Sequence, residues 1–212
     1  VDSFGNVVAV GEGEANITVS FAGDDKYVAS EAIITVTVSK IDTSIVVDDV
    51  ELDLNVGDEG SIVAELDPED AGVITFVSSD KSVVIVDSFG NVVAVGEGEA
   101  NITVSFAGDD KYAAAEDVIV TVNVSKIDTN IDVNENYFEL FVGDDGSIVA
   151  ELDPEDAGDI TFVSSDESVV TVDSEGNINA TGEGEAVITI SFVGNNMYKS
   201  SETTVTVTVS KK

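Results

Sequence analysis

Apolar and polar residues alternate along several short stretches of the chain, and this two-residue period is typical of β-strands with one buried face. The alternation is clearest over residues 100–106 and 118–125. Their apolar positions are Ala100, Ile102, Val104 and Phe106 in the first stretch and Val118, Val120, Val122 and Val124 in the second. We expect these side chains in a core and the residues between them in contact with solvent.

Turn-forming runs of Gly, Pro, Asp and Ser separate the alternating stretches. Over residues 41–126 we expect seven strands, at 44–54, 61–66, 73–78, 83–86, 91–95, 100–106 and 118–125. The first strand should be broken near 48–50, and no helix longer than a turn is expected. Seven short strands of this kind predict an all-β, immunoglobulin-like sandwich.

The chain is also built from repeats. Residues 1–27 recur letter for letter at 86–112, and an edited copy stands at 172–198. A period of this length suits one small β-domain per repeat. The sequence therefore predicts tandem immunoglobulin-like β-sandwiches arranged end to end, with complete repeats at 41–126 and 127–212.

Residues 1–40 carry only the C-terminal half of a repeat, with three expected strands of which the first is 7–10. Three strands with one apolar face cannot close a sandwich, so this half should not fold alone. Between the complete repeats only Lys126, Ile127 and Asp128 separate the last strand of one from the first strand of the next. A link so short, without Gly or Pro, should be stiff, with Ile127 buried against the sandwich ends.

Differences between the repeats fix which side of a strand is buried. On the strand at 91–95, two residues are expected inward and two outward. The inward pair Val92 and Ala94 becomes Ile178 and Ala180 in the next repeat, whereas the outward pair Val93 and Val95 becomes Asn179 and Thr181. Only the inward pair stays apolar, as a strand with one buried face requires.

The charge of the chain excludes several kinds of partner. Asp and Glu number 43 against 8 Lys and Arg, for a net charge of −35, so nucleic acid and anionic lipid are repelled.

No apolar run reaches the roughly 18 residues of a membrane span, and we expect no membrane insertion in this segment. Cysteine is absent, so there is no disulfide framework. No signal peptide precedes Val1, which predicts that the chain is cut from a longer one.

Residues 74–106, ITFVSSDKSVVIVDSFGNVVAVGEGEANITVSF, resemble the bacterial Ig-like group 2 domain of the invasin and intimin type. The GDDKY run and the TVNVSKIDT run at 121–129 are also similar to Ig-like arrays in adhesin-like surface proteins of methanogenic archaea. A Trp expected on the third strand of this family is Phe76 here and Phe162 in the next repeat. The resemblance implies an extracellular stalk or adhesion module with no catalytic residues.

The residue types leave little room for an enzyme. His, Cys, Arg and Trp are absent, so only chemistry with paired carboxylates remains. Glu97 and Glu99 form such a pair, but they lie in an expected turn, where acidic side chains are usually solvated. The Gly-rich run at 96–99 opens a strand and not a helix, so it lacks the anion site of a phosphate-binding loop. We therefore expect no enzymatic activity.

Four Asn residues occur in the sequence pattern for N-glycosylation: Asn16, Asn101, Asn123 and Asn179. The expected alternation places Asn101, Asn123 and Asn179 outward, where a glycan could stand. Ordinary polar alternation in strands rich in Asn and Thr explains the same pattern. Both readings stay open from the sequence.

Acidic loops should gather at both ends of each sandwich, so the link between repeats is a candidate Ca²⁺ site. The candidate metal ligands are Asp58, Glu97, Glu99, Asp128, Asp153 and Asp156. Mutual repulsion of the acidic ends, which would keep a rod extended, is the alternative. The Asp pair of GDDKY becomes GNNMY at 194–198, so those carboxylates are not needed in every repeat, and no EF-hand loop is present.

These observations favour a non-enzymatic extracellular module on the cell surface. It would serve as the repeat stalk of an adhesin or filament that projects a distal binding region. Its partners would be neighbouring repeats of the same longer chain and a host or partner cell surface. The alternative is that the repeats themselves bind carbohydrate or protein, as lectins do. Exposed aromatic residues would favour the second reading, and Tyr27, Tyr112 and Tyr198 look instead like packing anchors.

Overall fold

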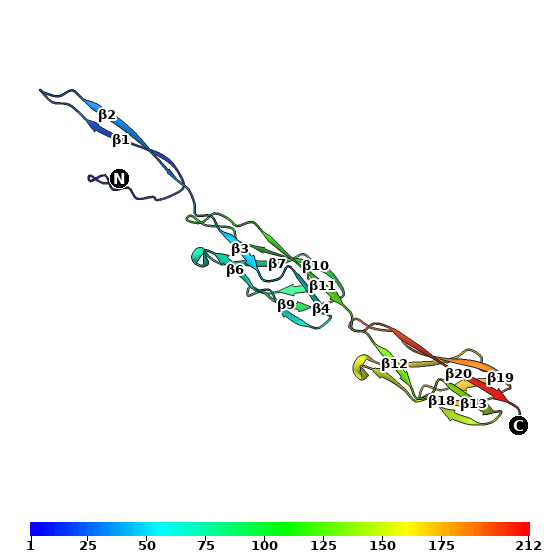
Figure 1. Ribbon diagram of the computed structural model, residues 1–212. Coiled ribbons are helices and arrows are strands. Elements are labelled where there is room, and N and C mark those ends of the chain that lie inside the picture. Colours follow the sequence, from blue (N-terminus) through cyan, green and yellow to red (C-terminus); the bar gives the residue numbers. More distant parts are fainter.

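The computed structural model describes residues 1–212, and the two stretches with the clearest alternation form the central hairpin of residues 41–126 (Figure 1). Strand β10 (Gly98–Ser105) pairs antiparallel with β11 (Val118–Ser125), with Ile102 opposite Val120. Strand β7 (Thr75–Ser78) lies antiparallel along the other side of β10. Strand β4 (Glu51–Asn55) lies parallel to β11, which gives the sheet order β4-β11-β10-β7.

The second layer of this sandwich consists of two small sheets. Strand β3 (Ser44–Val47) pairs with β6 (Ala64–Asp67). Strand β9 (Asn91–Ala94) lies between β5 (Glu59–Ser61) and β8 (Val84–Val86). The expected break in the first strand is confirmed, because β3 and β4 are separated at 48–50 and belong to different layers.

The expectation of one continuous strand at 61–66 was wrong. The Ile62 amide donates to the Gly90 carbonyl at 2.8 Å, whereas the Val63 carbonyl accepts from the Asp48 amide at 3.2 Å. The chain thus changes partner between these two residues, from the β9 side to the β3 side, and the strand divides into β5 and β6. Gly90 has φ +85°, and a Cβ there would lie 2.4 Å from the Ile62 carbonyl oxygen, so only glycine fits beside this crossing.

The buried residues confirm the alternation that the sequence predicts. The alternating positions of β10 and β11 from Ala100 to Val124 are buried, apart from the half-buried Val118. On β9, Val92 and Ala94 are buried while Val93 is 39% exposed. Phe76 is half-buried against the same core. The only helical turn of this repeat, η1 (Glu69–Ala71), is a single 3-10 turn after β6.

Residues 127–212 repeat the arrangement strand for strand. The elements are β12 (Asn130–Val133), β13 (Tyr137–Phe141), β14 (Asp145–Ser147), β15 (Ala150–Asp153), η2 (Glu155–Ala157), β16 (Thr161–Ser164), β17 (Val170–Val172), β18 (Asn177–Ala180), β19 (Gly184–Phe192) and β20 (Ser201–Ser210). Ile178 and Ala180 are buried and Asn179 is exposed, as expected. The predicted fold class of tandem sandwiches is therefore confirmed.

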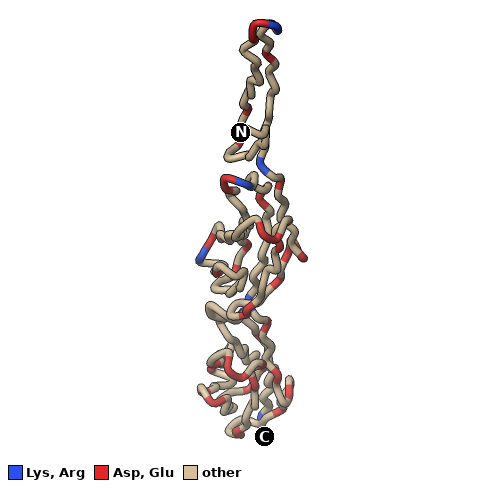
Figure 2. The backbone as a smooth tube through the Cα atoms, turned by 90° about the vertical axis from the view of Figure 1, so that its left-hand side faces the viewer, with Lys and Arg blue, Asp and Glu red and all other residues tan.

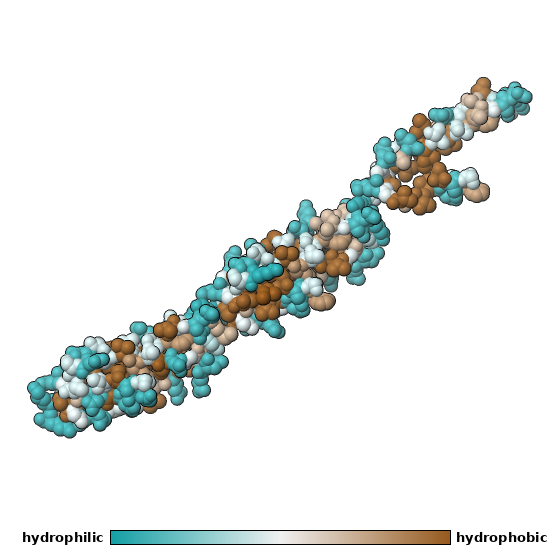
Figure 3. Space-filling view, turned by 180° about the vertical axis from the view of Figure 1, so that it is seen from behind, coloured by the Kyte–Doolittle hydropathy of each residue, from teal (hydrophilic) through white to brown (hydrophobic).

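Residues 1–40 form a two-stranded hairpin of β1 (Gly13–Phe21) and β2 (Ser30–Val38). The strand expected at 7–10 is not formed, because residues 1–40 contain no counterparts of β5 and β8, which hold β9 in the complete repeat. No side chain of this segment is buried, and hydrophobic residues of the hairpin are open to solvent (Figure 3).

The hairpin and the two sandwiches follow one another along a single direction (Figure 1). Acidic residues are distributed over the whole length of this rod, and basic residues are few (Figure 2). Neither 3-10 turn is long or apolar enough to cross a membrane.

Candidate joint between successive repeats

The link between the sandwiches is held by backbone hydrogen bonds to the second sandwich. Ile127 forms an isolated parallel bridge with Tyr198. The Ile127 amide donates to the Met197 carbonyl at 2.9 Å, and the Ile127 carbonyl accepts from the Lys199 amide at 2.8 Å. The side chain of Ile127 packs against the core of residues 127–212. The middle residue of the link is therefore part of the sandwich that follows it.

The preceding link is built in the same way. Ile41 forms a parallel bridge with Tyr112, its amide donates to the Lys111 carbonyl at 2.9 Å, and its carbonyl accepts from the Ala113 amide at 2.8 Å. A Thr hydroxyl two residues later donates to the same loop, from Thr43 to the Ala113 carbonyl at 3.0 Å. Both links thus dock onto the loop between the last two strands of the following repeat.

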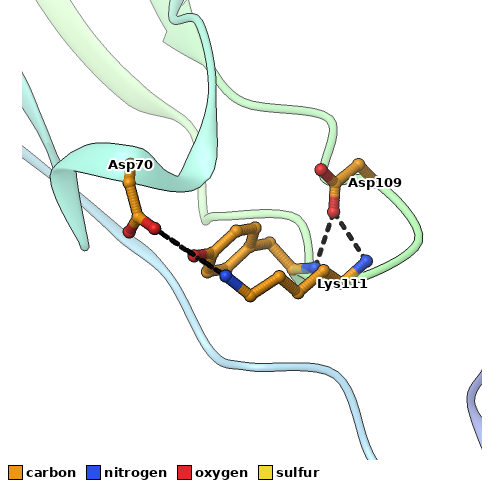
Figure 4. A network of polar contacts seen from close by, with 4 residues as sticks. Asp70, Asp109 and Lys111 are labelled. Carbon is orange, nitrogen blue, oxygen red and sulfur yellow. Dashed lines mark hydrogen bonds and ion pairs between the residues drawn. The ribbon is translucent and has the colours of Figure 1, made fainter. Parts of the chain in front are cut away.

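The loop that receives Ile41 is shaped by Asp109 (Figure 4). One carboxylate oxygen, Oδ1, accepts hydrogen bonds from the amides of Lys111 and Tyr112, each at 2.7 Å. The Asp109 amide in turn donates to the Tyr112 carbonyl at 3.0 Å. The amides of Tyr112 and Lys111, helped by the charge of Lys40, lower the pKa of Asp109. The ionised carboxylate therefore holds the loop that receives the link.

Tyr112 fastens this loop to the body of its sandwich. Its ring is buried, and its hydroxyl donates to Asp70 Oδ2 in η1 at 2.9 Å. Lys111 Nζ donates to the same hydroxyl at 2.6 Å, lies 4.4 Å from the ring centroid, and is 3.7 Å from Asp70 Oδ2. The hydrogen bond to Tyr112 and the charge of Asp70 raise the pKa of Lys111. These contacts tie the loop, and with it the link, to η1.

The second loop keeps the geometry with different residues. Asn195 Oδ1 accepts from the amides of Met197 and Tyr198, each at 2.9 Å, and Asn195 Nδ2 donates to the Ala157 carbonyl at 2.8 Å. The Tyr198 hydroxyl donates to Asp156 Oδ1 at 3.3 Å, and burial together with the Asp156 charge raises the pKa of Tyr198. An amide oxygen replaces the carboxylate oxygen, so GNNMY can stand in place of GDDKY.

Side chains of the link are also paired on each side of the joint, Lys126 with the first sandwich and Asp128 with the second. Lys126 Nζ lies 3.9 Å from Glu97 Oε2, and Lys199 Nζ donates to Asp128 Oδ1 at 2.8 Å. The bond to Asp128, with the charges of Asp128 and Glu97, raises the pKa of Lys199. Met197 of the second sandwich covers Gly57 of the first, since a Cβ built on Gly57 would lie 3.0 Å from Met197 Cε. The joint thus combines a docked link, ion pairs and one apolar contact.

The candidate metal ligands do not come together. No group of three or more His, Cys, Asp or Glu side chains is placed to hold a metal ion. Several have a partner of their own: Asp58 accepts from the Asn55 amide, Glu97 pairs with Lys126, Asp128 with Lys199, and Asp156 with the Tyr198 hydroxyl. Glu99 lies on β10 opposite Asn123, and Asp153 ends β15 opposite Asn130. Calcium at the joint remains a prediction without a ligand set.

The glycosylation candidates lie on strands, with their side chains engaged. Asn16 and Asn101 accept from the hydroxyls of Thr35 and Thr121 at 2.8 and 3.1 Å. Asn123 Nδ2 donates to Glu51 and Asp53, and Asn179 Nδ2 donates to Asp145 at 2.6 Å. Glycosylation at these positions also remains a prediction.

The sequence reasoning did not find the bridges from Ile41 and Ile127 to Tyr112 and Tyr198. A signal was present, because the run Ser-Lys-Ile-Asp-Thr stands at both links, residues 39–43 and 125–129, and each bridged Tyr recurs in its loop. Recurrence alone could not indicate that the Ile and the Tyr lie side by side.

Comparison with known families gives two matches along the chain. Residues 42–115 and 128–205 each match the family described as Bacterial Ig-like domain (group 2). Among curated proteins, an uncharacterized protein of Clostridium acetobutylicum is 30% identical over 164 residues, which cover 75% of this chain and 16% of that protein. A second one from the same organism is 38% identical over 71 residues, 32% of this chain and 18% of that protein. The chain spans less than a fifth of either relative, and neither relative supports the archaeal likeness.

Solved structures that are similar include the S-layer protein SbsC, with a TM-score of 0.39 and 17% identity over 99% of this chain and 37% of that chain. Drosophila N-cadherin EC1-4 has a TM-score of 0.37 and 15% sequence identity, over 94% of this chain and 58% of that chain. The D00-D0 domain of intimin has a TM-score of 0.32 and 9% sequence identity, over 78% of this chain and 98% of that chain. The assignment of this chain rests on the family match, not on these distant likenesses.

Proposed function

Because the chain belongs to the Bacterial Ig-like domain (group 2) family, we propose that it is a segment of a stiff extracellular stalk at the cell surface. The docking of Ile127 onto the loop of the following sandwich carries this proposal. A link whose central residue is bonded on both sides has little freedom to bend, whereas a flexible linker would leave its backbone groups to water. The same docking at Ile41 makes stiffness a property that each added repeat extends.

The surface charge fits the same role. A net charge of −35 spread along the rod repels neighbouring rods and favours an extended array. Residues 41–126 and 127–212 then act as separate sandwiches that contribute length and project a distal binding region. Ig-like repeats of this kind are structural or adhesion modules, and no step of this role requires catalysis.

A lectin-like role for the repeats has less support at their tyrosines. Sugar-binding faces usually offer exposed aromatic rings, but Tyr112 and Tyr198 are buried and hold the loops of the joint. Tyr112 and Tyr198 therefore serve the stalk as packing anchors, whereas the packing role expected for Tyr27 was wrong, because its ring is 56% exposed in the incomplete repeat.

Small-angle X-ray scattering on the chain tests stiffness directly. With strands that rise about 3.4 Å per residue, each repeat should add roughly 35 to 45 Å of length. We expect a pair-distance distribution with the long tail of a rod. Insertion of Gly-Ser-Gly-Ser between Lys126 and Ile127 leaves Ile127 docked but frees the first sandwich, so the longest distances should be lost. A compact, folded-back wild type, or an insertion without effect, would refute the stalk proposal.

A further inference from the structure

A groove runs across the first sandwich between strand β6 and the segment that leads from η1 to β7, and the turn from β8 to β9 stands at one end of it. Its lining is Ser61, Ile62, Val63, Ala64, Glu65, Leu66, Glu69, Gly72, Val73, Ile74, Phe76, Ser88 and Phe89. Three of its apolar side chains are open to solvent: Phe89 is 84% exposed, Val73 78% and Val63 51%. Bulky apolar side chains gathered in this way mark binding surfaces more often than scattered exposed ones.

One wall of this groove is an unpaired strand edge. Strand β6 pairs only with β3, in a two-stranded sheet. Because the Val63 carbonyl accepts from Asp48 on the β3 side, antiparallel alternation turns the backbone groups of Glu65 toward β3 as well. The backbone groups of Ala64 and Leu66 then point the other way, toward the groove. They are free to pair with an added strand.

The second sandwich carries the same groove with different chemistry. It is lined by Ala150, Glu151, Leu152, Glu155, Gly158, Asp159, Ile160 and Ser174, the counterparts of groove residues in the first sandwich. Across the groove positions the two repeats differ only where Val73 becomes Asp159 and Phe89 becomes Glu175. Both changes are at exposed positions and convert apolar side chains into acidic ones, while the arrangement of the strands stays the same. The fold therefore does not need apolar side chains at positions 73 and 89, and these side chains are available to contact a partner.

We propose that the groove of residues 41–126 binds an extended, basic segment of a partner protein, which adds as a strand to β6 and packs apolar side chains against Val73 and Phe89. Main-chain hydrogen bonds to Ala64 and Leu66 would supply affinity, and the side chains would supply selectivity, as in other complexes made by strand addition. The inference is independent of the stalk proposal.

Charge decides the chemistry of the partner. Glu65 and Glu69 line the groove, and the whole chain carries a net charge of −35. A second copy of this acidic chain would be repelled, whereas Lys or Arg residues that alternate with apolar ones would be attracted. The acidic residues of the second groove add charge but remove the apolar contacts, so that groove serves as an internal control.

The test uses fluorescence anisotropy with a labelled eight-residue peptide that alternates Lys with Val and has one central Phe in place of a Val. The chain is studied whole, as wild type, as V73D/F89E and as D159V/E175F. Each variant copies the residues of the other repeat, which already folds with them. The same peptide with every backbone nitrogen methylated has no donor on either edge, so it cannot pair as a strand and reports on attraction by charge alone.

We expect the V73D/F89E variant to bind the peptide at least tenfold more weakly, and D159V/E175F to gain a second site of similar affinity. Nonspecific attraction predicts the opposite order, because V73D/F89E adds two negative charges and D159V/E175F removes two. Tighter or unchanged binding by V73D/F89E would overturn the proposal, as would equal binding of the methylated peptide. Failure of D159V/E175F to gain a second site would also overturn the proposal. This test is independent of the first, because the groove of residues 41–126 is unchanged in that variant.

Discussion

Ile127 and Tyr198 lie side by side in a parallel bridge, although the first residue joins two repeats and the second closes the last loop of the chain. The link therefore takes its position from the end of the following repeat, not from its beginning. A repeat must complete its final hairpin before its N-terminal link is fixed, so the stiffness of the joint depends on the folding of the whole second sandwich.

Replacement of Ile127 by Pro should loosen the joint without unfolding either sandwich. Proline has no amide hydrogen, so the bond to the Met197 carbonyl is lost. Because the chain lacks cysteine, Lys81 and Glu167, which are exposed at matching places in the two repeats, can be changed to Cys and spin-labelled cleanly. Double electron–electron resonance should give a narrow distance distribution for the wild type and for Ile127→Val, and a broad one for Ile127→Pro. Equal widths would argue against the bridge as the source of stiffness.

Tyr112→Phe should destabilise the first sandwich by about 0.5 kcal/mol, the low end for a hydrogen bond, because the Asp70 side chain that accepts it is 74% exposed to water. Tyr198→Phe should have a smaller effect, since its bond to Asp156 is longer, at 3.3 Å. Tyr137 provides the Tyr→Phe control, because its side chain is 47% exposed and its hydroxyl has only long bonds, to Glu139 at 3.2 Å and Thr208 at 3.3 Å, so its loss should cost less than that of the Tyr112 hydroxyl. Urea unfolding followed by circular dichroism measures all three. A Tyr137→Phe effect as large as that of Tyr112→Phe would contradict the role of the Asp70 bond.

Most of the fold could be predicted because its cause is local. The alternation over 100–106 places Ala100 and Ile102 inward in any sheet that has one wet face, and both are buried. The division of the strand at 61–66 could not be predicted, because Ser61, Ile62 and Val63 contain no breaking residue. The division follows from the distant Gly90 carbonyl, which captures the Ile62 amide.

Identical sequences in this chain also adopt different structures when their surroundings differ. Residues 7–10 have the sequence of 92–95, yet only the second copy contributes to a strand, β9, because β5 and β8 lie beside it. The docking of the link could not be predicted either, since the sequence indicates a short link but not which loop receives it. The acidic residues expected to gather there are instead held apart, several of them by single partners such as Lys126 and Lys199.

Acid should weaken the first sandwich through Asp109. Its pKa is lowered by the amides of Tyr112 and Lys111, so the carboxylate stabilises the fold above its ordinary pKa of 3.8. That contribution is lost as the pH falls below 3.8 through the lower folded value. Asp109→Asn keeps the acceptor oxygen, as Asn195 does, and does not titrate. Thermal melts from pH 7 to about pH 3 should therefore show a smaller loss for Asp109→Asn than for the wild type.

Asp110→Asn makes the same change of charge one residue later and is the control for general electrostatics. Its stability should depend on pH in the same way as that of the wild type, because no backbone amide of the loop donates a hydrogen bond to the Asp110 side chain. If the two Asn variants gain equally in acid, repulsion over the whole surface and not the Asp109 turn explains the effect.

Calcium and magnesium should act alike on the joint. Asp128 is paired with Lys199 at 2.8 Å and no ligand set surrounds it, so divalent ions should only screen the acidic surface. Distance distributions between the two spin labels should respond equally to millimolar Ca²⁺ and Mg²⁺, and Asp128→Asn should not alter the comparison. Narrowing by micromolar Ca²⁺ alone, abolished by Asp128→Asn, would restore the calcium hypothesis.

The hairpin of residues 1–40 offers the strictest test of how much context contributes, because residues 13–21 have the same sequence as 98–106. Intrinsic exchange rates depend on neighbouring side chains, so they are nearly equal for the two copies. Only the surroundings differ: Ile17 is half-buried and Val19 is 55% exposed, whereas their counterparts Ile102 and Val104 are fully buried.

Strand β10 is bonded on both sides, by β11 and β7, while β1 is bonded only to β2. A two-stranded hairpin without a covered face is marginally stable in water, so its amides should open by local fluctuations. Hydrogen exchange followed by NMR should show the amides of 15–21 exchanging at least a hundredfold faster than those of 100–106. Equal protection would mean that the apolar side chains of the hairpin are covered in solution, by a second copy or by residues 1–12. A dilution series would distinguish the two, because only contact with a second copy depends on concentration.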